Sequence, residues 1–254
     1  MTIAILSALP EEQSGLAAAL ENACEVRHAG RSFVQGLLHG HEVVLGLTGI
    51  GKVAAATTTT AVIERWGVQH ILFTGVAGGV GPGVQVGDVV VAQQFVQHDM
   101  DVRPLFARWQ VPGYPSPLFD CDAQLHQGLL QAARSCVQQA QTWQVPLLQG
   151  RTPQVHTGLV ASGDQFIVAA AVAQGIQQDL QAAGHAVLAV EMEGAAIAQT
   201  CADYGLPFAA VRTISDRADE LTHVDFPAFV RTVASRYAQH IVLNWLENAK
   251  KASE

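Results

Sequence analysis

Short apolar segments recur along the chain, separated by polar turns and by longer stretches of helical composition. The short segments have the length and the Val, Ile and Leu content of buried strands, and the stretches between them are long enough for helices. Strands that alternate with helices predict an α/β fold in three layers, with a central mixed β-sheet flanked by helices. The expected strands are 2–9, 32–38, 42–47, 70–74, 89–95, 156–161, 186–190 and 208–214, and the expected helices are 10–24, 53–66, 122–141, 167–183, 194–204 and 226–250.

Two segments fit neither pattern. The glycine-rich stretch Gly75–Asp88, "GVAGGVGPGVQVGD", predicts a long loop with little regular structure. The stretch His98–Pro117 mixes prolines and aromatic residues without a period, which predicts an ordered excursion loop. The chain has no linker, internal repeat or low-complexity tract, so residues 1–254 are expected to form a single domain.

The composition narrows the class of function. Apolar residues make up 49 % of the 254 residues, which allows a sizeable core, and the net charge of −8 argues against a nucleic-acid partner. No apolar run is long enough to span a bilayer, and the N-terminus lacks a signal-peptide pattern, so a cytoplasmic protein without membrane association is expected. The wide spacing of the four cysteines and the scattered histidines predict free thiols and neither a metal site nor a cofactor.

Carboxylates follow four of the expected strands. The carboxyl ends of parallel strands share one edge of a sheet, where ligands bind, so these turns are expected to converge on one rim. Each acid taken alone could equally cap a helix N-terminus. The four turns are Glu11–Glu12, Ser162–Phe166, Glu191–Glu193 and Ser215–Asp219.

Several carboxylates beside one aromatic ring suit a neutral ligand that has hydroxyl groups and a flat ring. Carboxylates accept hydrogen bonds from sugar hydroxyls, and an aromatic face stacks on a base. A protonated carboxyl group can protonate a leaving group, while a second carboxylate takes a proton from water. This set of groups predicts a displacement at a sugar carbon.

An ordered set of motifs strengthens this interpretation. The segments are "SALPEE", "GIGKVAAA", "TGVAGG", "VGDVVV", "HDMDV", "SGDQFI", "VEMEGAAIAQTC" and "RTISDRAD". Together they resemble the 5′-methylthioadenosine/S-adenosylhomocysteine nucleosidases of the purine nucleoside phosphorylase superfamily, from about residue 2 to residue 245. The resemblance implies that water cleaves an N-glycosidic bond and that adenine and a 5-thioribose derivative are released.

The resemblance also implies roles for individual residues around the sugar. Asp216 would be the general acid that protonates N7 of adenine, with Ser215 orienting it. Glu12 would position and activate the attacking water, Glu193 would bind the ribose hydroxyls, and Met192 would pack on the sugar. Glu191 is expected to be a supporting residue at the strand end, with direct contact to the ligand as the alternative, and its neighbour Glu193 is the one placed for the sugar diol.

Further residues would surround the base and the rest of the ligand. Phe166 would stack on adenine, the backbone of Ile167 would read its edge, and Phe226 would close over the base or the alkylthio end. Arg212 would support the region of Asp216 and Glu12, and Gly78 and Leu9 complete the expected pocket.

The excursion loop bears on subunit assembly. In the resembling family a neighbouring subunit lends part of this loop to the 5′-alkylthio pocket, which implies a homodimer. Val102, Leu105 and Phe106 are the candidates for that contribution, with packing in the chain's own core as the alternative.

Alternative activities stay open at this point. A phosphorylase needs donors around an anion, and Val76 stands where many relatives carry a hydroxyl, which favours water as the nucleophile. A related enzyme could act on another nucleoside, such as futalosine, AMP or 5′-deoxyadenosine. A nucleoside-binding protein without activity would lack the acid or the water-positioning carboxylate, and both are present here.

Overall fold

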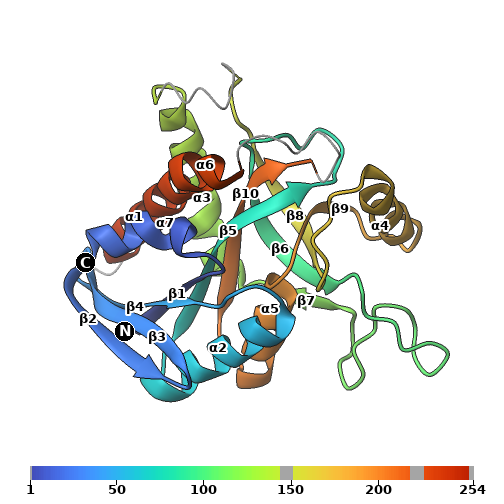
Figure 1. Ribbon diagram of the computed structural model, residues 1–254, viewed down its shortest axis with the longest axis horizontal. Helices are drawn as coiled ribbons and strands as arrows, with labels where there is room; N and C mark the ends of the chain where they lie inside the picture. Colours follow the sequence, from blue (N-terminus) through green and yellow to red (C-terminus); the bar gives the residue numbers. More distant parts are fainter. Residues whose placement is uncertain (1, 144–150, 218–225, 252–254) are drawn as a thin grey trace.

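A ten-stranded mixed sheet runs through the computed structural model, which describes residues 2–143, 151–217 and 226–251 (Figure 1). The strands are β1 (Thr2–Ser7), β2 (Glu21–His28), β3 (Arg31–Leu38), β4 (His41–Leu47), β5 (His70–Gly79), β6 (Val89–Gln97), β7 (Leu118–Asp120), β8 (Val155–Ser162), β9 (Val187–Glu191) and β10 (Phe208–Asp216). The helices are α1 (Pro10–Ala19), α2 (Lys52–Trp66), α3 (Ala123–Ala140), α4 (Ala170–Ala182), α5 (Gly194–Tyr204), α6 (Phe226–Phe229) and α7 (Ser235–Lys251).

Five of the strands form a closed ring within this sheet. The order β10–β6–β8–β9–β5 closes because β5 also pairs with β10, while β1, β4, β3 and β2 extend outward from β5. Strands β1, β5 and β10 run in one direction, and β6, β8 and β9 run in the opposite direction. The last link is short, since β5 meets β9 only through the pairs Gly78–Val190 and Gly79–Ala189.

This closure changes the reason why the strand ends meet. We expected a shared rim because parallel strands point the same way, and that reason is wrong for β8 and β9, which run opposite to β1 and β10. The two groups overlap at their carboxyl ends, where the last residues of β5 pair with the last residues of β9. The predicted turns therefore still lie at one place.

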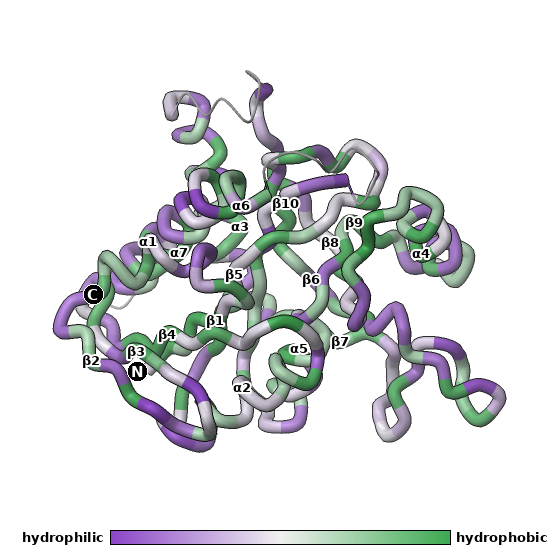
Figure 2. The backbone as a smooth tube through the Cα atoms, viewed as in Figure 1, coloured by the Kyte–Doolittle hydropathy of each residue, from purple (hydrophilic) through white to green (hydrophobic). Residues whose placement is uncertain are grey.

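Helices cover the sheet in layers, as the α/β pattern predicts. In Figure 1, α1, α3 and α7 lie together on one face, and α2 and α5 lie together on the other. Separate clusters of buried apolar side chains fill these layers, with Phe33, Phe73 and Phe95 on the α2/α5 side and Leu16, Leu129 and Tyr237 on the α1/α3/α7 side. Figure 2 shows hydrophobic colour along central strands such as β9 and hydrophilic stretches at the β2 edge.

Most expected elements are confirmed, but the segment 10–24 is not one helix. The helix ends at Ala19, and Glu21–His28 forms the edge strand β2, which pairs with β3 and with no other strand in the described ranges. Nearly all of β2 is exposed, so its sequence lacks the apolar alternation that identifies a half-buried strand. An edge strand with charged side chains also resists pairing with other chains.

The predicted glycine-rich loop is wrong in its first part, because Gly75–Gly79 continues strand β5. Close approach of buried side chains explains the glycine at position 75. A Cβ atom there would lie 2.6 Å from both Arg212 Nη1 and Glu12 Oε1. The backbone of β5 therefore passes close to two buried charged groups at Gly75, where a side chain would collide with them.

The C-terminal segment 226–250, predicted as one helix, is helical in three parts. A π-helical turn over Val230–Ala234 joins α6 to α7. The long α7 presents its buried side to α1 and α3. None of the helices in the described ranges combines the length and apolar character that crossing a bilayer requires.

The packing of α5 yields a stability prediction. A Cβ atom on Gly194, the first residue of α5, would lie 2.2 Å from the buried ring of Phe95. We expect Gly194→Ala to destabilise the fold by roughly 1–3 kcal/mol, because a well-packed core does not accept an added methyl group. Thermal unfolding should show a lower Tm by several degrees.

The matched control is Gly175→Ala within α4, where a Cβ atom would meet nothing within 4 Å. Alanine is the better helix former by roughly 1 kcal/mol, so this variant should be as stable as the parent or more so. Equal effects of the two substitutions would contradict the packing argument.

Candidate active site

A cavity of about 410 Å³ lies where the carboxyl ends of β1, β5, β9 and β10 meet. It collects every residue that the sequence assigned to the chain's own pocket. These are Leu9, Glu12, Gly78, Phe166, Ile167, Met192, Glu193, Arg212, Ser215, Asp216 and Phe226. The last two residues of the "RTISDRAD" motif, at 218 and 219, lie outside the described residues.

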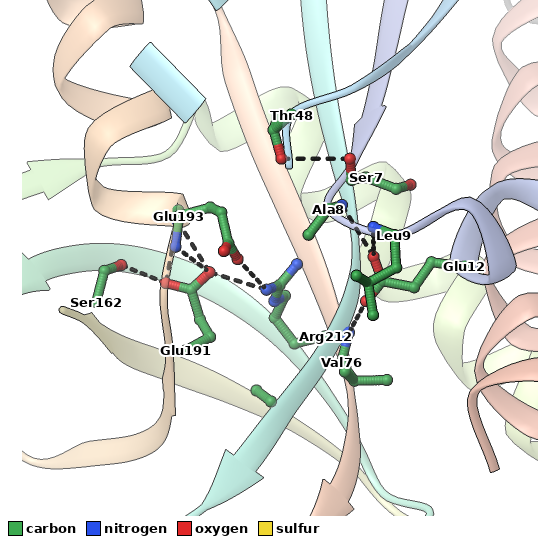
Figure 3. Close-up of polar contacts among 12 residues, drawn as sticks. Ser7, Ala8, Leu9, Glu12, Thr48, Val76, Ser162, Glu191, Glu193 and Arg212 are labelled. Carbon is green, nitrogen blue, oxygen red and sulfur yellow. Dashed lines mark hydrogen bonds and ion pairs between the residues drawn. The ribbon is translucent and has the colours of Figure 1, made fainter. Parts of the chain in front are cut away.

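Glu12 is held in the first turn of α1 by three backbone N–H groups (Figure 3). Its Oε2 accepts hydrogen bonds from the amides of Ala8 and Leu9, each at 2.9 Å, and its Oε1 accepts one from the amide of Val76 at 2.9 Å. Complete burial raises the pKa of Glu12, against the opposing effects of Arg212 and these amides. The carboxyl group is thus fixed in direction, and its pKa lies above the ordinary value.

Glu191, which ends β9, is saturated with hydrogen bonds. Its oxygens accept from the Ser162 hydroxyl, from Arg212 Nη2 at 2.9 Å, and from the backbone amides of Glu193 and Gly194 at about 3 Å. The carboxylate therefore caps the start of α5 and neutralises Arg212 (Figure 3). Its oxygens are engaged in this way, but Glu191 also lines the cavity, so its expected role as a supporting residue stays a prediction.

Glu193 comes directly before α5 and faces the same guanidinium. Its Oε1 accepts from the amide of Gly51 at 2.9 Å, and its Oε2 lies 3.4 Å from Arg212 Nη2. Burial, and then the nearby charge of Glu191, raise the pKa of Glu193 to about 7. Its carboxyl group therefore changes protonation near neutral pH, whereas an exposed glutamate would be ionised.

Arg212 lies on β10 and is almost completely buried. Its guanidinium stacks over Phe73 at 4.2 Å and forms ion pairs with Glu191 and Glu193. We expected Arg212 to support the region of Asp216 and Glu12, but its hydrogen bonds go to the acids after β9, and Glu12 feels it only electrostatically. Its Nε and Nη1 have no hydrogen-bond partner among the described residues.

Asp216 is buried at the end of β10 and lines the same cavity as the acids at the end of β9. The hydroxyl of Ser215 donates to Asp216 Oδ2 at 2.8 Å and lies 3.5 Å from the carbonyl oxygen of Ala77. A hydroxyl held between a strand carbonyl and a carboxyl group orients that carboxyl group. The expected orienting contact between Ser215 and Asp216 is thus present.

Two aromatic side chains also line the cavity. The rings of Phe166 and Phe226 meet edge to face, with centroids 6.4 Å apart and an interplanar angle of 74°. Phe166 is 63 % exposed, so its face is available to a flat ring in the cavity. The pocket thus combines a charged inner end with an apolar, aromatic side.

Other lining residues were missed from the sequence. They include Ala8, Ile50 and Val190, which have apolar side chains and so no chemical signature. Val76 has no hydroxyl group, yet it lines the cavity and its amide holds Glu12. Ala8 lies within the motif "SALPEE" and Ile50 within "TGIGK", so these motifs could have indicated that both residues line the cavity.

The three loop candidates stand apart from this cavity. Val102, Leu105 and Phe106 belong to the segment between β6 and β7 and do not line the pocket within one chain. Leu105 is 82 % exposed, so the alternative that it packs in the chain's own core is wrong. The described residues contain no cluster of His, Cys, Asp or Glu side chains that could hold a metal ion.

Comparisons with known proteins all indicate the same family. Residues 2–246 match the model of the phosphorylase superfamily. The chain is 36 % identical over 251 residues to a 5′-methylthioadenosine/S-adenosylhomocysteine nucleosidase of Bacillus cereus (strain B4264), covering 98 % of this chain and 100 % of that protein. A protein of the same name from Geobacillus thermodenitrificans is 36 % identical over 247 residues, which are 97 % of this chain and 96 % of that one.

Solved structures extend the similarity to the fold. The nucleosidase of Neisseria meningitidis in complex with methylthio-immucillin-A superposes with a TM-score of 0.84 at 35 % identity, covering 97 % of this chain and 99 % of that one. A futalosine hydrolase of Helicobacter pylori superposes with a TM-score of 0.82 at 29 % identity, covering 98 % of each chain. The α/β fold with a mixed sheet and flanking helices is thereby confirmed.

The buried acids predict how stability depends on pH. The pKa of Glu193 is about 7 in the folded protein and near 4.5 in the unfolded chain. A raised carboxyl pKa stabilises the fold below the unfolded value, and this contribution is lost as pH rises through the folded value. We expect Glu193→Gln to gain stability relative to the parent between pH 5 and pH 8, by up to about 3 kcal/mol.

Urea unfolding at several pH values measures this difference. Glu12 remains in both proteins and contributes in the same direction, so the parent and the variant are compared at each pH. The control Glu247→Gln removes an exposed carboxylate whose pKa is lowered by Lys251, so this variant should lose stability relative to the parent. Parallel stability curves for the parent and Glu193→Gln would contradict the assignment.

Proposed function

The chain belongs to the phosphorylase superfamily and, within it, to the 5′-methylthioadenosine/S-adenosylhomocysteine nucleosidases, and from this premise we propose how its residues act. It is an N-glycosyl hydrolase that cleaves 5′-methylthioadenosine and/or S-adenosylhomocysteine into adenine and a 5-thioribose derivative. One observation carries the assignment of its residues. Glu12, Glu193 and Asp216 come from three separate strand ends and line a single cavity beside Phe166.

Glu193 binds the ribose hydroxyls in this proposal. Its carboxylate is already directed by the Gly51 amide and by Arg212, and a carboxylate can accept hydrogen bonds from two neighbouring hydroxyls. Met192 packs on the sugar, and Phe166, Ile167 and Phe226 receive the base and the alkylthio end.

The negative charge of the site favours the transition state. Glycosyl cleavage proceeds through an oxocarbenium-like sugar, on which positive charge develops. Glu12, Glu191 and Glu193 are buried around the single guanidinium of Arg212, so acidic groups outnumber basic ones beside the sugar position. Fixed carboxylates of this kind stabilise the cation without reorganising during the reaction.

Asp216 acts on the other side of the bond. It protonates N7 of the departing adenine while the Ser215 hydroxyl keeps the carboxyl group aimed at the base. A proton delivered as the bond breaks prevents negative charge from building on the leaving ring. Support for this role comes from the position of Asp216 in the cavity wall, close to the end of β5 at Gly78.

Glu12 positions the attacking water. Three amides leave part of Oε1 available as an acceptor, and the raised pKa suits a group that takes up a proton from water. Arg212 Nη1, which has no hydrogen-bond partner among the described residues, lies on the same side of Gly75 as Glu12 Oε1, where it can donate to the same water.

The pocket favours water over phosphate as the nucleophile. Arg212 is the one cationic side chain among the described lining residues, and it is already paired with two carboxylates. Val76 offers its amide to Glu12 and has no hydroxyl. A phosphate would meet buried acids with too few donors to offset its desolvation.

A homodimer is the proposed assembly. Large apolar side chains are exposed at the start of α2, in Ile50 and Val53, and on the excursion loop, in Leu105 and Phe106. Ile50 also lines the cavity, so apolar surface runs from the pocket to the exterior. A second subunit would cover this surface, with Val102, Leu105 and Phe106 entering the neighbour's pocket. We further propose that residues 1–254 form one domain and that the enzyme works in the cytoplasm.

An adenine-release assay tests the function and the acid together. The parent protein should release adenine from methylthioadenosine in phosphate-free buffer, and Asp216→Asn should lose at least ~100-fold in kcat, as expected for loss of a general acid. The matched control Glu25→Gln removes an exposed carboxylate on the edge strand β2 and should keep full activity.

The outcomes separate the alternatives. Turnover only with added phosphate would identify a phosphorylase, and release of a base only from another purine nucleoside would reassign the substrate. Near-parent activity of Asp216→Asn would refute the assignment of the acid.

The assembly has its own test. We expect Leu105→Glu to shift the protein from dimer to monomer in analytical ultracentrifugation, because a charge would be buried in the interface. The variant should also raise KM for methylthioadenosine. The control Ala182→Glu adds the same charge at an exposed position of α4 and should leave the dimer intact. A parent protein that sediments as a monomer would contradict the proposal.

A further inference from the structure

Three chain segments beside the pocket are joined by a closed ring of hydrogen bonds. Lys52 Nζ donates to Asp99 Oδ1 at 2.6 Å, the amide of Asp164 donates to Asp99 Oδ2 at 2.9 Å, and the amide of Lys52 donates to Asp164 Oδ1 at 2.7 Å. The three residues come from the start of α2, the loop after β6 and the turn after β8. We call them the Lys52–Asp99–Asp164 ring.

The ring provides an N-terminal cap for α2, which the residue before the helix cannot provide. The residue before this helix is Gly51, which has no side chain to cap the first amides. Asp164 provides the missing acceptor from another part of the chain. Its negative charge also suits the positive end of the helix dipole.

Gly51 connects the ring to the sugar end of the pocket. Its φ of 97° lies in the region that favours glycine, and in this conformation its amide donates to Glu193 Oε1. A Cβ atom at Gly51 would lie 3.1 Å from Asp164 Oδ1, so the ring packs directly on this residue. The direction of the Gly51 amide therefore depends on how the ring holds the start of α2.

Asp164 connects the same ring to the base end of the pocket. Gln165, Phe166 and Ile167 follow it in sequence, and all three line the cavity. The amide of Asp164 is bound within the ring, so this turn has a fixed starting point. The wall that faces the flat ring and the amide that orients Glu193 thus share one anchor.

The ring is also tied to the rest of the fold. Lys52 Nζ donates to Gln97 Oε1 at 3.0 Å, and Gln97 in turn donates to Gln199 on α5 at 2.7 Å. The side chains of Lys52 and Asp99 are only 16 % and 25 % exposed. Limited exposure and several partners distinguish this pair from an isolated surface ion pair, whose contribution is small.

We propose that Lys52, Asp99 and Asp164 are positioning residues, which set the Gly51 amide against Glu193 and the Phe166 turn against the base as one unit. The inference rests on the proposed function, since it concerns the geometry of the same pocket. The three residues do not line the cavity, so they act through Gly51 and Phe166 and not by contact with the substrate.

Kinetics of Lys52→Met with methylthioadenosine tests the proposal. The variant should lower kcat/KM about tenfold, the usual scale for losing a hydrogen bond to a charged group. Lys52→Arg keeps the charge and a donor and should recover part of the loss. Lys251→Met, which breaks an exposed ion pair far along α7, should match the parent.

The pH profile separates positioning from mere stabilisation. Glu193 is faced by Glu191 from β9, by Arg212 from β10, by Glu12 from α1 and by the Gly51 amide, and that amide lowers its pKa. If the Gly51 amide no longer donates to Glu193 in Lys52→Met, the pKa of Glu193 should rise. The acid limb of the kcat/KM profile should then move to higher pH. A purely structural role would lower the Tm and leave the limb unmoved.

A second variant covers the case in which Lys52→Met fails to fold. Asp99→Asn keeps an acceptor for Lys52 but offers an amide nitrogen to the Asp164 N–H, so it opens the ring at one bond. It should shift the acid limb in the same direction. Parent-like kcat/KM and pH profile in a folded ring variant would overturn the inference. An inactive parent protein would instead refute the proposed function.

Discussion

The buried guanidinium of Arg212 is the charge on which the rest of the site depends. Three carboxyl groups are buried around it, and removal of an ion from water is costly unless a partner compensates. Glu191 neutralises Arg212 with good geometry and uses its remaining capacity on Ser162 and the amides of α5. Glu193 and Glu12 are left with partial compensation, which keeps their pKa values raised. The fold thereby maintains an acidic pocket that a developing sugar cation relieves.

This arrangement explains why neighbouring acids have different roles. Glu191 and Glu193 are separated by one residue and both line the cavity, yet Glu191 accepts more hydrogen bonds from the protein than Glu193 does (Figure 3). The β-strand ends between them, so their side chains no longer follow one alternation. One residue therefore stabilises the site and the other is available for a ligand.

The sequence predicted the residues of the pocket better than the topology that unites them. Carboxylates at strand ends have a chemical signature, and the ordered motifs around them carry the family resemblance. Strand β2 has no such signature, because most of its side chains are exposed and it lies at the edge of the sheet beside β3. The extension of β5 through Gly75–Gly79 was hidden for another reason. Those glycines reflect contacts with residues far away in sequence, such as Arg212, and composition alone indicates a loop.

The short link between β5 and β9 has a mechanical consequence. It consists of two residue pairs and closes the ring of strands at the mouth of the cavity. Asp216 lies on the β5/β10 side of this seam, and Glu193 follows β9 on the other. Backbone amides of Val80 and Gly81 that donate to the carbonyl oxygen of Leu188 extend this link just beyond the two pairs. Local opening there would change the separation between the proposed proton donor and the proposed ribose-binding carboxylate, so this link helps to hold the two sides of the cavity in register.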